Sequence, residues 1–416
     1  MTTFYPPHHF GGDGVFVYRL AEALAARGHD VHVLHSPDAF RATADRTEPA
    51  VSFRYHANVK LFPLETSWPR LSALSVQQSG RPAAYARDVE RHFASHRYDV
   101  IHYHNVSLMG APALFRLGDA VKLYTAHEYW LICPAHVLFK YGREPCVSRA
   151  CVRCMLSHGR PPQIWRSTGL MDACLGEIDG FIMPSRFALD RHRQDGLLRD
   201  ATVLPHFVPL PSEDGPRTEP VAGERPFFLF AGRLEKLKGV QDLVRVFAEI
   251  RDADLLVAGT GGFEPELRTM ARDLPHVRFL GAMHPSEIGQ YYRRATAVLV
   301  PSLCYETFAL VGAEALAHGT PLVGRRIGAV AELVETSGGG LVFDTVAECR
   351  DGMRRLLDEP DLRADLGSTG RRHALRHWTE DAHLDRYFAL VESHMDRRGA
   401  GATPVSPLTT AGAGLA

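Results

Sequence analysis

The chain lacks any long apolar segment and any excess of charge of one sign. Its 416 residues hold 47 Lys and Arg against 48 Asp and Glu, a formal net charge of −1, and no run of about 18 uncharged apolar residues. Nucleic-acid binding needs a concentrated basic surface, which this balance does not favour. The N-terminus lacks the basic and then apolar layout of a signal peptide. We therefore expect a cytoplasmic protein that does not bind nucleic acid, and leave open peripheral contact with the inner face of a membrane.

Cysteine is scarce, yet four of the seven cysteines lie close together in the sequence. In a cytoplasmic protein, cysteines are more often thiols or metal ligands than disulfides. The spacing C-x12-C-x4-C-x2-C comprises Cys133, Cys146, Cys151 and Cys154. Four thiolates can enclose one tetrahedral zinc ion, and such a closed site is structural rather than catalytic. Free thiols and an iron–sulfur or redox use remain alternatives. Cys174, Cys304 and Cys349 are interpreted as buried small residues.

No complete G-x-G-x-x-G follows a strand with an acid about 20 residues further on, so a nicotinamide-dependent enzyme is not favoured. Short apolar strands instead alternate with helical patterns, which predicts an α/β fold. Strands are expected at residues 31–34, 100–103, 123–126 and 181–183, and near Phe228, Leu256, Val298 and Leu322. An amphipathic helix is expected between residues 15 and 27, with Gly28 as its end.

The length suits two domains. Residues 208–225 are rich in proline, glycine and charge without a period, which predicts a hinge linker between domains at 1–207 and 226–380. The first domain carries a cysteine-rich insertion at 131–160. A crossover helix is expected at 381–398, and the composition of residues 399–416 predicts a disordered tail. The apolar stripe of the crossover helix is Leu384, Phe388, Leu390 and Val391.

Two carboxylates stand at the start of an apolar helix within PSLCYETFALVGAEALAHGTPLVG. Glu306 and Glu314 have seven residues between them. A helix N-terminus offers unpaired N–H groups and a partial positive charge that suit a phosphate, while carboxylates suit the hydroxyls of a sugar or ribose. This combination indicates a nucleotide-sugar site.

The segment FFLFAGRLEKLKGV adds two cations. An expected strand ends before Gly232, so Arg233 and Lys238 follow the carboxyl end of a strand, where ligands bind in open α/β sheets. Both could face one diphosphate, and the alternative is a pair of solvated loop charges. A second acidic pattern, Asp252-Ala253-Asp254, precedes the strand LLVAG and therefore lies at its amino end. We interpret these acids as turn residues rather than as metal ligands.

The chain resembles the retaining glycosyltransferases of family 4 in the order of its motifs. These motifs are G-R-L-x3-K-G followed by E-x7-E, together with PSRFALD near Pro184 and a glycine-rich run at Gly11. The resemblance covers nearly the whole chain. It implies the GT-B fold, in which two Rossmann-like βα domains face a cleft and a C-terminal helix returns to the first domain. It also implies transfer of a sugar from a nucleoside-diphosphate sugar to the hydroxyl of a glycan, lipid-linked or small-molecule acceptor. The chemistry would need no metal, because the Arg and Lys pair substitutes for a divalent ion.

The resemblance also assigns residues. The catalytic residues would be Arg233, Lys238, His127 and Glu306, and the donor would be bound by Gly12, Gly14, Gly232, Glu306, Phe308, Ala309, Leu310 and Glu314. His127 and Glu306 would contact the transferred sugar, and Glu314 the nucleotide ribose. The role of Glu128 is left open. For His102 and His104, which also end a strand, a structural role and a role in the site are equally consistent with the sequence.

The sequence departs from the family in three places. Ala309 and Ala329 stand where the family usually or often has glycine, and only residues 1–5 precede the PPHHFGGDG loop, where the family has a full buried strand. We favour a start further upstream over a truncated central strand that leaves its neighbours without ladder bonds. The alternative functions are an epimerase-like GT-B enzyme that needs no acceptor and a non-catalytic sugar- or zinc-binding module.

Overall fold

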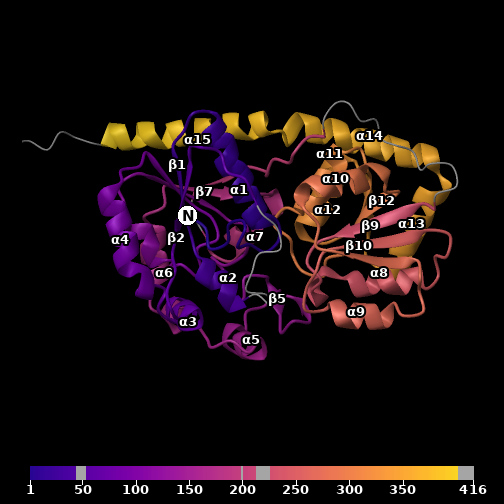
Figure 1. Cartoon of the computed structure of the whole chain (residues 1–416), viewed down its shortest axis with the longest axis horizontal. Helices are drawn as coiled ribbons and strands as arrows, with labels where there is room; N and C mark the ends of the chain where they lie inside the picture. The colour runs from indigo at the N-terminus through magenta and orange to yellow at the C-terminus, as the bar shows by residue number, and fades with distance from the viewer. Residues whose placement is uncertain (44–52, 198–199, 212–224, 402–416) are drawn as a thin grey trace, which may run out of the picture.

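The computed structural model describes residues 1–43, 53–197, 200–211 and 225–401. Most of the expected linker, residues 212–224, and most of the expected tail, residues 402–416, lie outside the described residues. Helices alternate with strands throughout, and the two halves of the chain build separate parallel sheets that lie side by side (Figure 1). The fold is thus the α/β architecture that the sequence predicts.

The first half has two parallel sheets built from short strands. All pairs are parallel, in the orders β1-β2 and β3-β4-β7-β8. The bounds are β1 Val31–His35, β2 Val59–Pro63, β3 Val100–Tyr103, β4 Val121–Thr125, β7 Gly180–Met183 and β8 Ala201–Val203. Between the two parts, the Thr2 N–H donates to the Leu34 carbonyl and the His104 N–H donates to the Met1 carbonyl, each at 3.0 Å. Both β1 and the end of β3 therefore find backbone partners in residues 1–3.

The second half has one six-stranded parallel sheet in the order β11-β10-β9-β12-β13-β14. The bounds are β9 Phe227–Ala231, β10 Asp254–Ala258, β11 Val277–Gly281, β12 Ala297–Val300, β13 Leu322–Arg325 and β14 Gly340–Phe343. Side chains of β9 alternate between two cores, as strand geometry requires. Phe228 and Phe230 pack with α8 (Val240–Phe247) and α13 (Val346–Asp358), and Leu229 packs with α11 (Leu310–Ala317). Helices thus cover both faces of this sheet.

The remaining helices connect these strands. Their bounds are α2 Pro37–Thr43, α3 Pro69–Ser79, α4 Ala86–Ser95, α5 Cys151–Ser157, α6 Leu170–Leu175, α7 Arg186–Gln194, α9 Glu264–Met270, α10 Pro285–Arg294, α12 Gly328–Ser337 and α14 Pro360–His377, with short 3-10 turns at Ala83–Tyr85, Ala113–Arg116, Ile164–Ser167 and Lys236–Lys238. A hairpin of β5 (Phe139–Lys140) and β6 (Glu144–Pro145) lies in the cysteine-rich insertion. No helix of the described residues combines the length and apolar content that a membrane crossing requires.

Helix α1 (Gly11–Ala26) begins earlier than the sequence predicts. The GGDG run forms its first turn, so the expected glycine-rich loop between strand and helix is wrong. Phe16 and Leu20 on this helix are buried against β4, and Gly28 follows the helix end with φ +90. The early start puts the backbone of Gly11 and Gly12 at a helix N-terminus, where N–H groups lack intrahelical partners.

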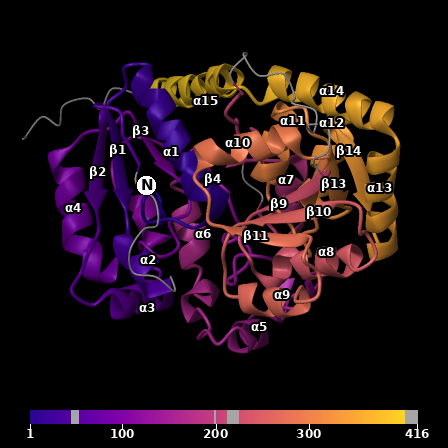
Figure 2. The same cartoon turned by 45° about the vertical axis from the view of Figure 1, so that its right-hand side comes forward.

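Helix α15 (Glu380–Gly401) returns to the first half (Figures 1 and 2). It lies along the first half while α14 lies along the second, at the same edge of the molecule. Leu384, Tyr387 and Val391 are buried in one cluster with α1 and β4, and each such side chain contributes about 1.5–3 kcal/mol. Phe388 and Leu390 are only partly buried there, and the sequence pattern missed Tyr387. Residues 399–401 are helical, so the expected boundary of the tail is too early.

Candidate functional site

The loop after β9 is held by close backbone packing. A β-carbon on Gly259 would lie 1.9 Å from the Gly232 carbonyl, and one on Gly239 would lie 2.1 Å from the Pro301 carbonyl. Gly239 has φ +78, a left-handed conformation that glycine adopts without strain. These contacts fix the turn that carries Arg233 and Lys238 to the carboxyl end of the sheet.

Lys238 and Glu306 form a partly buried ion pair. Lys238 Nζ lies 2.7 Å from Glu306 Oε1, and the Ser302 hydroxyl donates to the same oxygen at 2.6 Å. The side chains of Lys238 and Glu306 are 22% and 19% exposed. Burial opposes both charges, but the Glu306 carboxylate raises the pKa of Lys238, and Lys238 lowers the pKa of Glu306. Both groups are therefore ionised at neutral pH, and the two residues, which the sequence analysis assigns to one site, are in contact.

Arg233 is the more exposed cation of this site. Its guanidinium lies 2.8 Å from Glu235 Oε1, and its side chain is 43% exposed. Gly11 of α1 lies beside it, because a β-carbon there would be 3.7 Å from Arg233 Nε. The N-terminus of α1 and the Arg233 loop, far apart in sequence, therefore face each other.

The predicted glycines of α1 have different neighbours. A β-carbon on Gly12 would lie 2.8 Å from Leu310 Cδ1, so Gly12 meets the start of α11 as the donor-site prediction requires. Gly14 instead packs against the loop before the helix, where a β-carbon would be 2.8 Å from His9 Cβ. The structure thus gives Gly14 a packing role and does not place it among the donor-site residues.

The start of α11 has an unusual backbone conformation. Ala309 is its N-cap residue with φ +40 and ψ 61, in the left-handed region that favours glycine. Phe308 is buried, with its ring 5.3 Å from that of His206. The glycine that the family has at position 309 would suit this conformation, whereas the alanine costs backbone strain.

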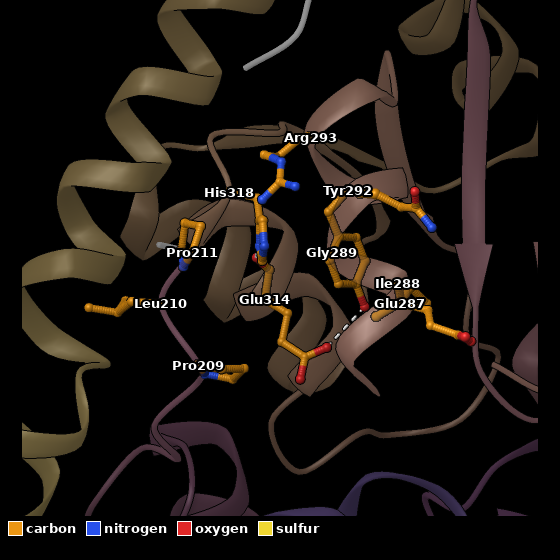
Figure 3. A pocket seen from close by; sticks show the side chains of 11 residues that line it. Pro209, Leu210, Pro211, Glu287, Ile288, Gly289, Tyr292, Arg293, Glu314 and His318 are labelled. Atoms are coloured by element: carbon orange, nitrogen blue, oxygen red, sulfur yellow. Dashed lines mark hydrogen bonds between the residues drawn. The ribbon is translucent and has the colours of Figure 1, made fainter. Parts of the chain in front are cut away.

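Glu314 is buried on α11 and engaged on both oxygens. The Tyr292 hydroxyl donates to Oε2 at 2.9 Å, and Arg19 of α1 lies 2.7 Å from Oε1. Figure 3 shows the carboxylate pointing toward Tyr292 at the side of a cavity of about 460 Å³. The cavity is formed by Pro209, Leu210, Pro211, Glu287, Ile288, Gly289, Gln290, Tyr292, Arg293, Glu314 and His318. The cavity lies beside Glu314, and Lys238 is not among the residues that form it. A nucleoside could bind there, next to the Glu314 carboxylate.

His127 follows β4 and lies where the two halves meet. Its Nε2 is 2.9 Å from His104 Nδ1, and its Nδ1 is 3.2 Å from His206 Nε2. Its carbonyl accepts a hydrogen bond from the Thr307 hydroxyl at 2.8 Å. Burial lowers the pKa of His127 to about 4, so the ring is neutral at pH 7 and both nitrogens are engaged. The sequence predicts the strand-end position but not this chain of three histidines.

His102 and Glu128 lie beside this chain of histidines without belonging to it. His102 Nε2 is 2.8 Å from the Thr125 hydroxyl, and its ring stacks on Tyr387 of α15. Glu128 pairs with His136 of the cysteine-rich insertion at 2.9 Å. His102 is thus held by the first-half core, and Glu128 anchors the insertion.

The cysteine-rich insertion lies against the donor-side residues. Tyr129, Cys133, Leu138 and Met155 form a buried cluster, against which Tyr305 and Cys146 pack. Burial raises the pKa of the Cys133 thiol and, together with the Cys151 and Cys154 thiols, that of Cys146. The four sulfurs do not form, in the described residues, a group of ligating atoms within 4.8 Å of one another.

The acids at the amino end of β10 are paired with arginines. Asp252 lies 2.6 Å from Arg354, and Asp254 lies 2.9 Å from Arg225. They are at the opposite end of the strand from the Gly232 loop, as the sequence analysis predicts. The site residues that the sequence analysis missed are Arg19, Tyr292, His206 and Ser302. Only Ser302, four residues before Glu306, carried a sequence signal.

Two family models match the chain. One, described as Glycosyltransferase Family 4, matches residues 10–211, and another, described as Glycosyl transferases group 1, matches residues 225–359. The first matched range ends at residue 211 and the second begins at residue 225, so the boundary between them falls within the expected linker at 208–225.

Curated relatives align with most of the chain. A D-inositol 3-phosphate glycosyltransferase of Acidothermus cellulolyticus is 30% identical, over 88% of this chain and 83% of the relative. Another of the same name, from Pseudarthrobacter chlorophenolicus, is 27% identical over 92% of each.

Solved structures show the same fold. A sucrose-phosphate synthase from Thermosynechococcus elongatus superposes with a TM-score of 0.72 at 21% identity, over 97% of this chain and 98% of that one. The Anabaena protein HepE, in complex with UDP and glucose, has a TM-score of 0.62 at 16% identity, over 91% of this chain and 96% of that one. The arrangement of parallel sheets and helices in this chain is thus a known architecture.

Proposed function

Because the chain belongs to family 4 of the glycosyltransferases and is a glycosyltransferase of the GT-B fold, we propose that it transfers a sugar from a nucleoside diphosphate to an acceptor hydroxyl. The anomeric configuration is retained, and no metal ion takes part in the chemistry.

The observation that carries the proposal is the Lys238–Glu306 pair at the carboxyl end of β9, with Arg233 beside it. A departing nucleoside diphosphate gains negative charge as the glycosidic bond breaks. Fixed cations stabilise that charge most in the transition state, and they act without a divalent ion. Glu306 keeps Lys238 charged and positioned, and its second oxygen binds a hydroxyl of the transferred sugar.

Retention is supported by the engagement of two candidate bases beside the donor site. Both ring nitrogens of His127 are engaged, and its pKa is lowered to about 4. Glu306 is paired with Lys238 and Ser302. The acceptor hydroxyl then attacks from the face of the leaving group, and its proton passes to the departing phosphate.

The nucleoside binds in the cavity beside Glu314, which bonds the ribose hydroxyls. This requires the Arg19–Glu314 ion pair to open or to shift, because Arg19 approaches Oε1 at 2.7 Å. The ligands of HepE, UDP and glucose, favour a uridine donor, and the names of the relatives favour D-inositol 3-phosphate as the first acceptor to test.

We also propose that Cys133, Cys146, Cys151 and Cys154 bind a structural zinc ion. The thiols lie in one insertion, and burial together with the nearby Cys151 and Cys154 thiols raises the pKa of Cys146, as expected for closely placed thiols. Zinc binding has to draw the sulfurs together, and it would order the insertion beside Tyr305.

The test is release of nucleoside diphosphate from UDP-, GDP- and ADP-sugars, with and without D-inositol 3-phosphate or mixed glycan acceptors. Lys238→Ala should lower turnover by roughly 100- to 1,000-fold, because it removes a charge that stabilises the transition state. Lys236→Ala is the matched control, since Lys236 is an exposed lysine of the same loop, and it should retain activity. EDTA should leave the rate unchanged, and NMR of the product should show the anomer of the donor.

Acceptor-dependent release from one donor, lost with Lys238, supports a transferase and identifies the donor. Release that is independent of acceptor would favour an epimerase or hydrolase. Equal activity of wild type and Lys238→Ala would contradict the assignment of the donor site, and an inverted product would contradict the proton path.

A further inference from the structure

Three histidines meet at a place remote from the donor site. His32 lies on β1, His92 on α4, and His96 directly after α4. One ligating nitrogen from each lies within 4.8 Å of the other two, and they form the candidate metal-binding group of the described residues. The three rings pack around Phe62. The centroid of the Phe62 ring is 4.9 Å from that of His32, 4.4 Å from that of His92 and 5.6 Å from that of His96.

The spacing of two of these histidines suits chelation. His92 and His96 are four residues apart, which places both on one face of a helix end, and their ring centroids are 4.6 Å apart. His32 completes the group from the neighbouring strand, with its ring 4.9 Å from that of His96. Two elements thus contribute ligands to one point.

Polar neighbours already orient the rings. The Tyr98 hydroxyl lies 2.8 Å from His32 Nδ1 and also bonds His92 Nε2. His32 Nε2 is buried, and Asp30 Oδ2 lies 3.4 Å from it. A carboxylate or hydroxyl on one nitrogen of an imidazole is a common partner of a metal-ligating histidine, so a metal ion would replace either Tyr98 or Asp30 at His32 and leave the other as that partner.

We propose that His32, His92 and His96 form a zinc site that links β1 to α4. Imidazole nitrogens suit Zn²⁺, which takes four ligands at about 2.0–2.1 Å from nitrogen, and Asp30, Tyr98 or water supplies the fourth position. The nitrogens have to move closer by a small amount, because tetrahedral ligands at that distance are roughly 3.3 Å apart.

The site is structural or regulatory rather than catalytic. His32 lies at the amino end of β1, in register with Lys60 of β2, whereas ligands of such folds bind at carboxyl ends. Zinc here would tie the edge of the first sheet to the helix that covers it. It is also independent of the four cysteines, which belong to another segment.

The experiment is calorimetric titration of the metal-free full chain with ZnCl2, beside His96→Gln and His377→Gln. His373 and His377 of α14 are a matched pair, four residues apart with ring centroids 4.6 Å apart, but no third ligand joins them in the described residues. Loss of an outer-shell partner already weakens metal binding about 10–100-fold, so His96→Gln should weaken it by about 100-fold or more. His377→Gln should bind as wild type does.

A second measurement separates this site from the cysteines. Titration with Co²⁺ should give visible absorption that His96→Gln loses and Cys151→Ser keeps, without a sulfur charge-transfer band of its own. His32→Asn serves as a second variant if His96→Gln melts lower without metal. The same number of zinc ions bound per chain in wild type and in both histidine variants, or a loss of binding in Cys151→Ser alone, would overturn the proposal.

Discussion

Ala309 carries a β-carbon at a backbone position that favours glycine. With φ +40 and ψ 61 it caps α11, the helix that presents Glu314. A left-handed alanine costs about 1–2 kcal/mol, partly offset by the greater entropy that glycine has in the unfolded chain. Ala309→Gly should therefore raise the free energy of unfolding by up to about 1 kcal/mol, as measured by urea denaturation.

The control for this prediction is an alanine with ordinary helical geometry. Ala331 lies inside α12, where glycine is less favourable than alanine by about 1 kcal/mol. Ala331→Gly should thus have the opposite sign. A decrease of stability in Ala309→Gly would show that strain at position 309 is relieved elsewhere.

At the scale of elements, helices α7 and α12 join the two halves. Glu332 of α12 accepts hydrogen bonds from the Arg186 and Phe187 N–H groups, at 2.8 and 2.6 Å, and so caps α7. Glu332→Ala should weaken the contact between the two halves by about 1.4 kcal/mol and lower kcat/KM about tenfold. Small-angle scattering should show a larger radius of gyration in solution.

Glu335→Ala is the matched control for Glu332→Ala. Glu335 lies on the same helix but pairs with Arg326 of the same half, at 2.8 Å. Its loss should change neither the radius of gyration nor kcat/KM. Equal effects of the two variants would mean that α12 itself, and not the contact between halves, is disturbed.

The cysteine-rich insertion allows a test at the same scale. Cys151→Ser should lower the zinc content by one ion per chain and reduce the Tm, because a structural site needs all four thiolates. Cys174→Ser is the control, since Cys174 is fully buried outside the insertion. It should lower the Tm but keep the zinc, and unchanged zinc in Cys151→Ser would exclude a zinc site at the cysteines.

At the scale of the whole molecule, buried histidines make the stability depend on pH. Burial lowers the pKa of several imidazoles to about 4, among them His35, His127, His192 and His383. An unfolded histidine titrates near pH 6.5, so the unfolded chain binds more protons between these values. The contribution of each group is complete above about pH 6.5 and is lost as the pH falls toward 4.

Urea denaturation at pH 7.5, 6 and 5 should show this loss, with a slope of up to about 1.4 kcal/mol per pH unit for each such histidine. Most carboxyl groups titrate lower, which leaves this window to histidine. His127→Gln should reduce the slope, whereas substitution of the exposed His56 by glutamine should not. A slope that His127→Gln leaves unchanged would mean that this ring binds its proton at the same pH in the folded and unfolded chains.

The sequence predicted much of the site because its motifs are local. Gly232, Arg233 and Lys238 follow one strand, and Glu306 stands before one helix, so chain order alone places them at the carboxyl edge of a sheet. Their ion pair at 2.7 Å agrees with that prediction. The start of α1 was predicted wrongly because glycines at a helix N-terminus have the same composition as a loop.

The sequence by itself determined the α/β class, most strands and the family, since each depends on periodicity or on residues near one another in the chain. Only the tertiary structure decided that Arg19 meets Glu314, that His206 joins His127 and that His32 meets His92. Each of these pairs joins elements far apart in sequence, and their distance depends on how sheets and helices pack against one another. No local pattern carries that information, because packing is set by the whole core.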